Sequence, residues 1–390
     1  MDPISNPYAP GAGQPPAALV GRDESLTNWD VAIQRIQLGR PARSAVLYGL
    51  RGVGKTVLLT RFKITAEDRG WIVAQVEAGT GKTLRESLAD SLYAPLLDLA
   101  RPSAGKRLLR ALQTALSFRA SVTESGAWSF GLDLSGAAGG GADTGVLEMD
   151  LATLVRDLAA ASEEEQVGLA ILIDEAQDLT AEELTAVCAT AHIVGQNSWR
   201  CLFGLAGLPS LPRELAEAKS YAERLFTYER IDQLPSPMAR EALVAPASEL
   251  GVLWREDGLS VILAEASGYP YFLQQYGQET WNVAASSPIT AVDARLGVAL
   301  GRAALDNGLF RSRWDRATRA EQEYLRSLAS DGDAVAPSGD VARRLGRTVN
   351  SLGPARAALI SKGLIYAPEH GAIAFTVPGM SDFIRRQPDA

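Results

Sequence analysis

The sequence predicts an α/β protein with a mostly parallel sheet, and three observations lead to this fold class. Apolar runs at 45–48, 71–76, 169–173, 201–205 and 225–231 alternate with long stretches of helical periodicity. A glycine-rich loop follows the first run, and two adjacent acids end the third. Strands that alternate with helices pack as layers around a parallel sheet, whose carboxyl edge binds ligands. We therefore expect the acids to lie at that edge.

Composition narrows the class of protein. A chain of 390 residues, 46% hydrophobic and 22% charged, is long enough for two or three folded domains. Two cysteines and two histidines argue against a disulfide framework or a zinc site. The charge, 38 minus 46 or −8, argues against a generally basic nucleic-acid coat. No apolar stretch approaches the roughly 18 residues of a membrane span, so we predict a cytoplasmic protein without a membrane partner.

A phosphate-binding motif lies between the first predicted strand and a helical stretch. It consists of Gly49, Leu50, Arg51, Gly52, Val53, Gly54, Lys55 and Thr56, which fit GxxxxGK[ST]. Glycines let the backbone turn its N–H groups onto phosphate oxygens, and the following helix adds its positive end. We expect Lys55 to reach the β- and γ-phosphates of ATP and Thr56 to ligate Mg²⁺. Val57 completes the predicted nucleotide-binding run.

A second run ending in GKT, Gly79–Thr83, follows the predicted strand at 71–76. The position that should hold its first glycine is Val76, inside that strand. We interpret the run as a loop, and the alternative is that Lys82 contributes to a site.

Two carboxylates follow the apolar run Leu169–Ile173. Asp174 is placed to hold Mg²⁺, and Glu175 to polarise the water that attacks the γ-phosphate. Acids also cap strands and begin helices. The phosphate-binding motif upstream favours the catalytic interpretation.

These segments resemble the AAA+ ATPases, particularly their initiator-like and signal-transduction (STAND) relatives. The resemblance rests on GLRGVGKT, LAILIDEAQ and VGRDE, and it extends over about residues 19–310 and into the C-terminal module. It implies a five-stranded sheet in the order 5-1-4-3-2, a helical lid, and ATP hydrolysis shared between subunits. It also implies that Val20, Gly21 and Arg22 line the adenine, whereas the alternative for them is a plain helix entry. Pro270, in the lid turn GYPY, joins the nucleotide site.

The sequence departs from this family at two sensor positions. The fourth strand runs LFGLAGL without a polar residue before Ser210, and Tyr271 stands where many relatives carry an arginine. Fewer donors for the transition-state charge predict slow hydrolysis. Arg224, before the fifth strand, matches the position of an arginine finger that acts on a neighbouring subunit. The alternative for Arg224 is a surface salt bridge.

The C-terminal residues predict three helices and a hairpin, the pattern of a winged helix-turn-helix. Between Val341 and Lys362 the chain has five bases and no acid. These bases, the predicted DNA-binding residues, are Arg343, Arg344, Arg347, Arg356 and Lys362. A local positive face suits phosphate neutralisation, although winged helices also dock proteins.

The predicted organisation has four parts: a disordered arm at 1–17, an AAA+ core at 18–234, a lid at 235–312 and a winged helix at 313–390. The core carries a hairpin and glycine-rich insertion at 117–145. We predict an ATP-dependent molecular switch with ATP, ADP and Mg²⁺ as ligands, and with double-stranded DNA, a protein or further copies of the chain as partners. The alternatives are a DNA-binding regulator or loader with structural nucleotide, and a STAND-like signalling or defence ATPase that docks a protein.

Overall fold

A computed structural model describes residues 1–99, 105–120, 140–164 and 167–388, and these residues divide into two compact units. The sheet unit contains residues 23–48 and 55–230. The lid unit contains residues 1–22, 49–54 and 231–390. The phosphate-binding motif therefore contributes residues to both units, since residues 49–54 belong to the lid unit and Lys55 begins the next part of the sheet unit.

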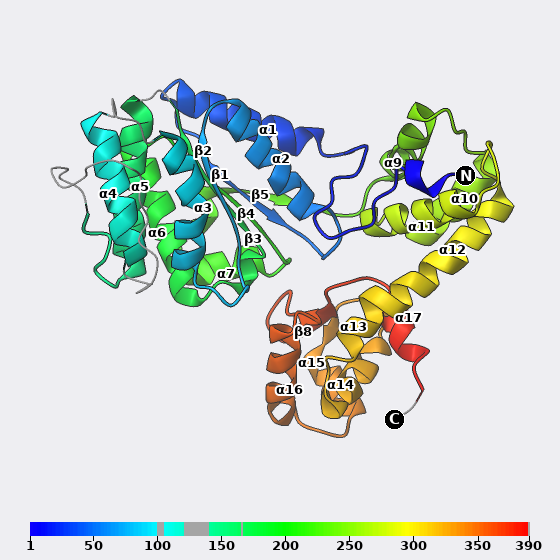
Figure 1. Cartoon of the computed structure of the whole chain (residues 1–390). Helices are drawn as coiled ribbons and strands as arrows, with labels where there is room; N and C mark the ends of the chain where they lie inside the picture. Colours follow the sequence, from blue (N-terminus) through cyan, green and yellow to red (C-terminus); the bar gives the residue numbers. More distant parts are fainter. Residues whose placement is uncertain (100–104, 121–139, 165–166, 389–390) are drawn as a thin grey trace. The chain divides into compact units, whose positions relative to one another are not determined.

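The sheet unit is built on five parallel strands in the order β2-β3-β4-β1-β5 (Figure 1). Read from the other edge, this order is the predicted 5-1-4-3-2. The strands are β1 (Ser44–Tyr48), β2 (Ile72–Glu77), β3 (Leu169–Asp174), β4 (Cys201–Gly207) and β5 (Phe226–Arg230). Every residue of β3 and β4 is buried, which explains why both read as continuous apolar runs rather than alternating ones.

Helices cover both faces of this sheet. They are α1 (Asp23–Gln37), α2 (Lys55–Asp68), α3 (Leu84–Leu99), α4 (Lys106–Ala120), α5 (Leu147–Glu164), α6 (Ala181–Asn197), α7 (Leu211–Ala218) and α8 (Ala222–Leu225). Ile171 and Phe203 point into the core that α3 to α7 enclose. Gly204, next along β4, faces α1 and α2, because a methyl group on it would meet Leu59 and Trp29. Successive residues of β4 thus point to opposite faces of the sheet, and each face is covered by its own layer of helices.

The region around the predicted insertion differs from the expectation. Ser117 and Phe118, expected in a hairpin, lie in α4, and the expected hairpin at 121–139 lies outside the described residues. Helix α5 was not predicted. Leu151, Leu154 and Leu158 are among its buried residues, and their three- and four-residue spacing was the available signal.

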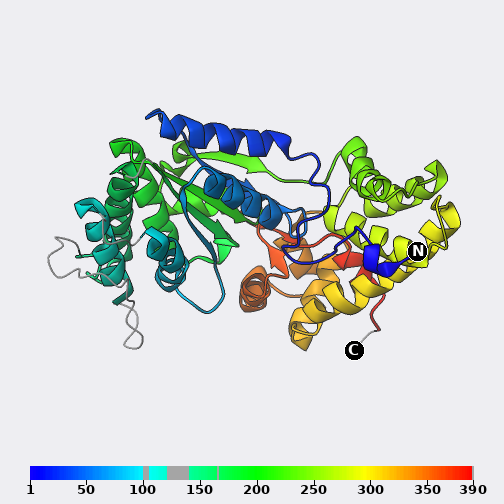
Figure 2. The same cartoon turned by 45° about the horizontal axis from the view of Figure 1, so that its top comes forward.

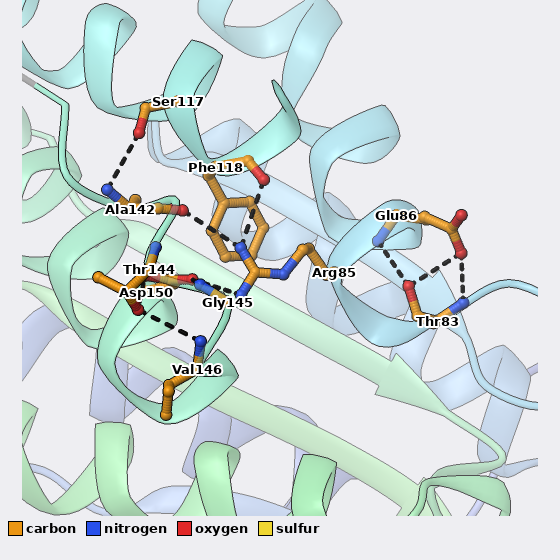
Figure 3. Close-up of polar contacts among 10 residues, drawn as sticks. All are labelled: Thr83, Arg85, Glu86, Ser117, Phe118, Ala142, Thr144, Gly145, Val146 and Asp150. Atoms are coloured by element: carbon orange, nitrogen blue, oxygen red, sulfur yellow. Dashed lines mark hydrogen bonds and ion pairs between the residues drawn. The ribbon is translucent and has the colours of Figure 1, made fainter. Parts of the chain in front are cut away.

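A buried ion pair between Arg85 and Asp150 connects α3 and α5 next to the end of α4 (Figure 3). Arg85 of α3 stacks on the Phe118 ring at 4.7 Å and donates to Asp150 of α5 at 2.5 Å and to the Ala142 carbonyl at 3.2 Å. Asp150 also accepts from the Thr144 N–H at 3.0 Å and hydroxyl at 2.7 Å. Burial alone would raise the pKa of Asp150, but the bonds from Thr144 and Arg85 lower it. The carboxylate is therefore held charged in the interior.

The lid consists of α9 (Ser236–Glu249), α10 (Glu256–Ala266), α11 (Pro270–Val283) and α12 (Ala291–Leu305). A π-helical turn, η3 (Asp306–Phe310), and the short α13 (Arg311–Trp314) lead from it into the C-terminal module. In the described part of the chain, no helix is both long and apolar enough to cross a membrane.

The N-terminal residues are packed against the lid, which corrects the disordered arm expected at 1–17 (Figures 1 and 2). Tyr8 is 2% exposed, packs edge-on against Trp254 and Trp281, and donates to the Leu243 carbonyl. Trp254 donates to the Tyr8 hydroxyl at 3.0 Å. The Pro- and Gly-rich composition suggested disorder, but one buried aromatic residue and its hydrogen bonds hold the segment in place.

The C-terminal module has the predicted helices and hairpin. Its helices are α14 (Arg319–Ala329), α15 (Ser338–Arg344), α16 (Val349–Ser361) and α17 (Met380–Arg385). Its strands β6 (Ala336–Pro337), β8 (Ala372–Phe375) and β7 (Ile365–Tyr366) form an antiparallel sheet in this order. A small antiparallel sheet together with three helices is the arrangement of a winged helix.

Candidate functional site

Three predicted nucleotide and metal residues come together at the carboxyl edge of the sheet. Lys55 is the first residue of α2 and is 7% exposed, and Asp174 is the last residue of β3 and is also 7% exposed. The Thr56 hydroxyl forms a hydrogen bond with the Asp174 carboxylate. The two side chains predicted to ligate Mg²⁺ are therefore neighbours. Val57 is buried in α2.

The environment of Asp174 disfavours its charged form. Burial raises the pKa of Asp174, and this effect outweighs the hydrogen bonds from Thr56 and from the Glu175 N–H, together with the attraction of Lys55. A buried carboxylate with a raised pKa gains most from a cation that neutralises it. Hard oxygen donors at such a position suit Mg²⁺.

Glu175 is oriented by a residue that the sequence analysis did not single out. Its backbone is left-handed, with φ 48°, which is uncommon for a residue with a side chain. The Gln177 amide nitrogen donates to the Glu175 carboxylate at 2.6 Å, and the Gln177 amide oxygen accepts from the Leu208 N–H at 2.9 Å. Gln177 thus connects the predicted catalytic acid to the end of β4. Its place two residues after Glu175 was the available signal.

Within the lid unit, the backbone of the phosphate loop, residues 49–54, is tightly constrained. A methyl group on Gly49 would lie 2.0 Å from the Ile231 carbonyl oxygen, so only glycine fits there. Gly52 and Gly54 have φ of 84° and 96°, in the region that glycine adopts without strain. The glycine pattern is therefore required by the observed loop.

Three elements far away in the sequence bond to the phosphate loop. Arg22 donates to the Val53 carbonyl at 3.1 Å and to the Asp232 carbonyl at 2.7 Å. The Tyr271 N–H donates to the Gly52 carbonyl at 3.3 Å. The Arg51 N–H donates to the Thr376 carbonyl, beyond β8, at 3.1 Å. The loop is thus held by the N-terminal segment, the lid and the winged helix.

The other residues predicted to surround the nucleotide lie nearby in the chain or in the lid unit. Val20, Gly21 and Leu50 are half-buried, and a methyl group on Gly21 would meet Leu234 and Met238 of the lid. Pro270 is the first residue of α11, after the turn that places Tyr271. The guanidinium of Arg22 is bonded to carbonyls, so it anchors the loop in this structure.

Arg224 lies in α8, directly before β5, and its side chain is exposed. In the described part of the chain Arg224 forms no ion pair, so the surface salt bridge that was the alternative is not found among these residues. Its exposure is compatible with an action on another copy of the chain.

Acids neutralise three of the five bases predicted to bind DNA. Arg343 pairs with Asp340 at 2.9 Å, Arg344 with Asp331 at 2.5 Å, and Lys362 with Glu321 at 2.5 Å. Two of these acids precede α15 by many residues, which is why the charge count along 341–362 missed them. Arg347 is exposed, and Arg356 is half-buried.

The run at Gly79–Thr83 has no free helix N-terminus to offer a phosphate. Glu86 accepts from the Thr83 N–H at 2.7 Å (Figure 3), and Glu183 accepts from the Leu84 N–H at 2.6 Å. Lys82 pairs with Asp90 at 2.9 Å. The interpretation of this run as a loop agrees with these contacts, because the amides at the start of α3 already bind carboxylates.

Comparison with known proteins agrees with this geometry. Residues 18–203 match the family described as AAA ATPase domain, and residues 307–384 match a Domain of unknown function (DUF8462). Among solved structures, the Walker-type ATPase of Pyrococcus abyssi is similar with a TM-score of 0.59 and 15% identity, over 94% of this chain and 96% of that one. Aeropyrum pernix ORC1 in complex with DNA follows with a TM-score of 0.44, 15% identity and coverage of 96% and 94%.

The Thermotoga maritima RuvB Holliday junction branch migration motor has a TM-score of 0.43 and 14% identity, with coverage of 91% and 92%. No curated protein matches the chain. The match to the family model, the order of the strands and the likeness to the Pyrococcus protein agree with one another. Residues 18–203 are therefore an AAA ATPase domain, followed in the chain by a helical lid and a module like a winged helix.

Proposed function

We propose that this protein is an ATP-dependent switch that hydrolyses ATP slowly and changes the state of its winged helix with the nucleotide. Lys55 and the N–H groups of residues 49–56 bind the phosphates. Val20, Gly21 and Pro270 border the base. The phosphates are thereby bound along one continuous loop of the chain.

Thr56 and Asp174 would hold Mg²⁺ in this switch, and their hydrogen bond supports the assignment. Among the described residues, no three acidic, histidine or cysteine side chains form a cluster fit for a metal. This suits magnesium, which proteins bind through one or two side chains together with phosphate oxygens. When bound there, the ion supplies charge neutralisation to the phosphates.

Hydrolysis would use Glu175 to orient and polarise the attacking water, with Gln177 holding the carboxylate. The buried apolar β4 and Tyr271 after Pro270 provide few donors for transition-state charge, which is why we expect slow turnover. Arg224 of a second copy is exposed and unpaired among the described residues, so it can supply a further donor in an oligomer.

The observation that carries the coupling is the hydrogen bond from the Arg51 N–H to the Thr376 carbonyl. Amides of a phosphate loop bind phosphate oxygens, so a carbonyl on one of them is a competing acceptor. Thr376 is 1% exposed and is fixed by bonds from its hydroxyl to the Gly363 and Leu364 carbonyls. A displacement of the Arg51 backbone is therefore transmitted to Thr376, directly after β8 of the C-terminal module.

The partner of the winged helix depends on the charge of its exposed face. Three ion pairs, with Arg343, Arg344 and Lys362 as their bases, reduce the positive face. Arg347, which is exposed and lies outside these pairs, is then its main charge. A surface pair such as Arg343 with Asp340 is weak, about 1 kcal/mol or less, so phosphate could still compete for it. We favour a protein partner, with double-stranded DNA as the competing candidate.

Hydrogen exchange on the full chain tests the switch. We expect ATP with Mg²⁺, compared with ADP, to change the exchange of the Arg51 amide and of residues 372–388 together. Lys55→Ala should weaken nucleotide binding at least 100-fold and remove both changes in exchange, because it deletes the positive charge that binds the phosphates. Nucleotide binding that leaves the wing unchanged in the wild type would contradict the coupling.

Salt dependence separates the two partners. If the winged helix binds DNA, Arg347→Gln should weaken binding and lower the slope of affinity against salt by about one contact. Arg295→Gln, an exposed change on α12, is the control. A wild-type chain without measurable DNA affinity at moderate salt would favour the protein partner.

A further inference from the structure

A groove of about 500 Å³ lies between α1 and the edge of the five-stranded sheet. All residues that line it belong to the sheet unit, and none belongs to the phosphate loop. Val31 and Ala32 of α1, Ala45 of β1 and Phe62 of α2 give the groove an apolar lining. Val31 is 46% exposed, although it is a large apolar residue. Cavities of this size with an apolar lining are typical of binding sites, so the groove has room for a large apolar side chain.

The groove extends along an edge strand. In the described part of the chain, β5 pairs with β1 alone, so it ends the sheet on this side. Thr227 and Glu229, alternate residues of β5, line the groove. An edge strand leaves N–H and C=O groups along one side that can pair with an extended segment of another chain. The groove therefore suits an extended peptide segment.

Three arginines lie at one end of the groove. Arg35 and Arg43 line it, and the Arg40 N–H donates to the Arg35 carbonyl at 2.8 Å. All three side chains are exposed, and the Arg35 Nε donates to the Pro41 carbonyl at 3.0 Å. Among the described residues, none of the three arginines forms an ion pair with a carboxylate. This end of the groove is therefore a positive surface without a neutralising partner.

Two acids of the surrounding elements have other partners. Asp30 of α1 pairs with Arg69 at 2.6 Å, and Glu229 accepts from the Asn28 amide at 3.5 Å. The positive end also contrasts with the chain as a whole, whose net charge is −8. Complementary charge gives a protein interface its orientation and its choice of partner. Carboxylates of a partner are the groups that complement this surface.

We propose that the groove binds an extended, acidic segment of a partner protein. A large apolar side chain of the segment enters the groove beside Val31 and Ala32. Carboxylates of the segment pair with Arg35 and Arg43, and its backbone pairs with the free edge of β5. Because the phosphate loop is not part of this site, the inference does not depend on the proposed nucleotide binding.

Fluorescence anisotropy of the full chain with defined peptides tests this inference. The probes are labelled decapeptides with a central Leu, Phe or Trp, with Asp and Glu on one or both sides and with Ser and Thr elsewhere. We expect members of this set to bind saturably. Matched peptides with Lys in place of the acids, or Ala in place of the apolar residue, should bind about tenfold more weakly or less. Affinity for the acidic peptides should fall as the salt concentration rises.

Variants of the chain locate the site. Arg43→Glu should weaken binding of the acidic peptides about tenfold or more, because it replaces attraction by repulsion. Arg295→Glu, at an exposed arginine of α12, is the matched control and should leave the affinity unchanged. Ala32→Phe should abolish binding, since it fills the groove and keeps the arginines. If Ala32→Phe does not fold, as its melting temperature will show, Val31→Asp at an exposed position should give the same loss.

Three outcomes would overturn the inference. The first is that no peptide of the set binds the wild-type chain, and the second is an equal loss of affinity in Arg43→Glu and Arg295→Glu. The third is that Arg43→Glu weakens binding of short double-stranded DNA and leaves peptide binding unchanged, because the arginines would then bind nucleic acid. A wild-type chain that binds the peptides but no nucleotide would refute the proposed switch and leave this inference standing.

Discussion

The sheet edge and the phosphate loop hold their residues in different ways. At the sheet edge, Asp174, Glu175 and Gln177 are close neighbours in the sequence, and the Gln177 amide reaches Glu175 at 2.6 Å. At the phosphate loop, Arg51 is bonded to Thr376 and Gly52 to Tyr271, which are hundreds of residues away. The residues proposed to carry out hydrolysis are thus close together in the sequence. The residues that hold the phosphate loop come instead from distant parts of the lid unit.

Glu175→Gln tests the sheet edge with the largest expected effect on catalysis. Removing the carboxylate should lower the rate of ATP turnover about 100- to 10,000-fold, because general bases contribute on this scale. Nucleotide affinity, measured by titration calorimetry, should change little. Equal turnover in the wild type and this variant would remove Glu175 from the mechanism.

A variant at Gln177 tests whether catalysis by Glu175 depends on the hydrogen bond from Gln177. Gln177→Glu keeps an oxygen for the Leu208 N–H but replaces the donor that faces Glu175. We expect kcat to fall about 10- to 100-fold with KM within twofold, since small misplacements of reacting groups cost this much.

Gln34→Ala, at an exposed position of α1, is the control for this change. A parallel change in KM, or a lower melting temperature with unchanged kcat, would indicate that Gln177 only stabilises the fold.

Asp174→Asn separates stability from function at the sheet edge. Because the pKa of Asp174 is raised in the folded state, the folded chain binds its proton more tightly than the unfolded chain. Stability is therefore lost as the pH rises from the unfolded pKa, about 3.9, through the folded value.

Without Mg²⁺ and nucleotide, the variant should melt at a higher temperature than the wild type at neutral pH, because Asn carries no charge to bury. The difference should vanish below pH 4, and Mg²⁺-dependent turnover should be lost. A variant less stable than the wild type at neutral pH would contradict this assignment.

Tyr8→Phe tests whether the N-terminal segment stabilises the lid, and we expect its effect to be the smallest of these variants. It removes the hydroxyl between the Leu243 carbonyl and Trp254, so it should lower the free energy of unfolding by about 1–2 kcal/mol. Chemical denaturation measures this, and Ile4→Ala, at a residue that is 94% exposed, is the control. If both variants unfold alike, the hydrogen bonds of the Tyr8 hydroxyl do not stabilise the lid unit.

Local patterns carried much of the prediction. The order of the five strands, which the resemblance to the AAA+ ATPases implied, is confirmed. The motif residues Lys55, Thr56 and Asp174, found from local spacing, lie together. Helix α5 was missed because it follows a glycine-rich stretch that interrupted the reading of periodicity. The N-terminal arm was wrongly expected to be disordered, since its composition does not show that Tyr8 has a pocket to fill.

The sequence by itself determined the ATPase domain, because a phosphate loop and a pair of acids need fixed residue types at short spacings. Only the tertiary structure decided which distant groups meet that loop. Thr376 carries no signal in its own neighbourhood, and the acids that neutralise Arg344 and Lys362 lie outside the segment whose charge was counted. Contacts of this kind arise from the packing of elements far apart in the chain, which local periodicity and spacing do not encode.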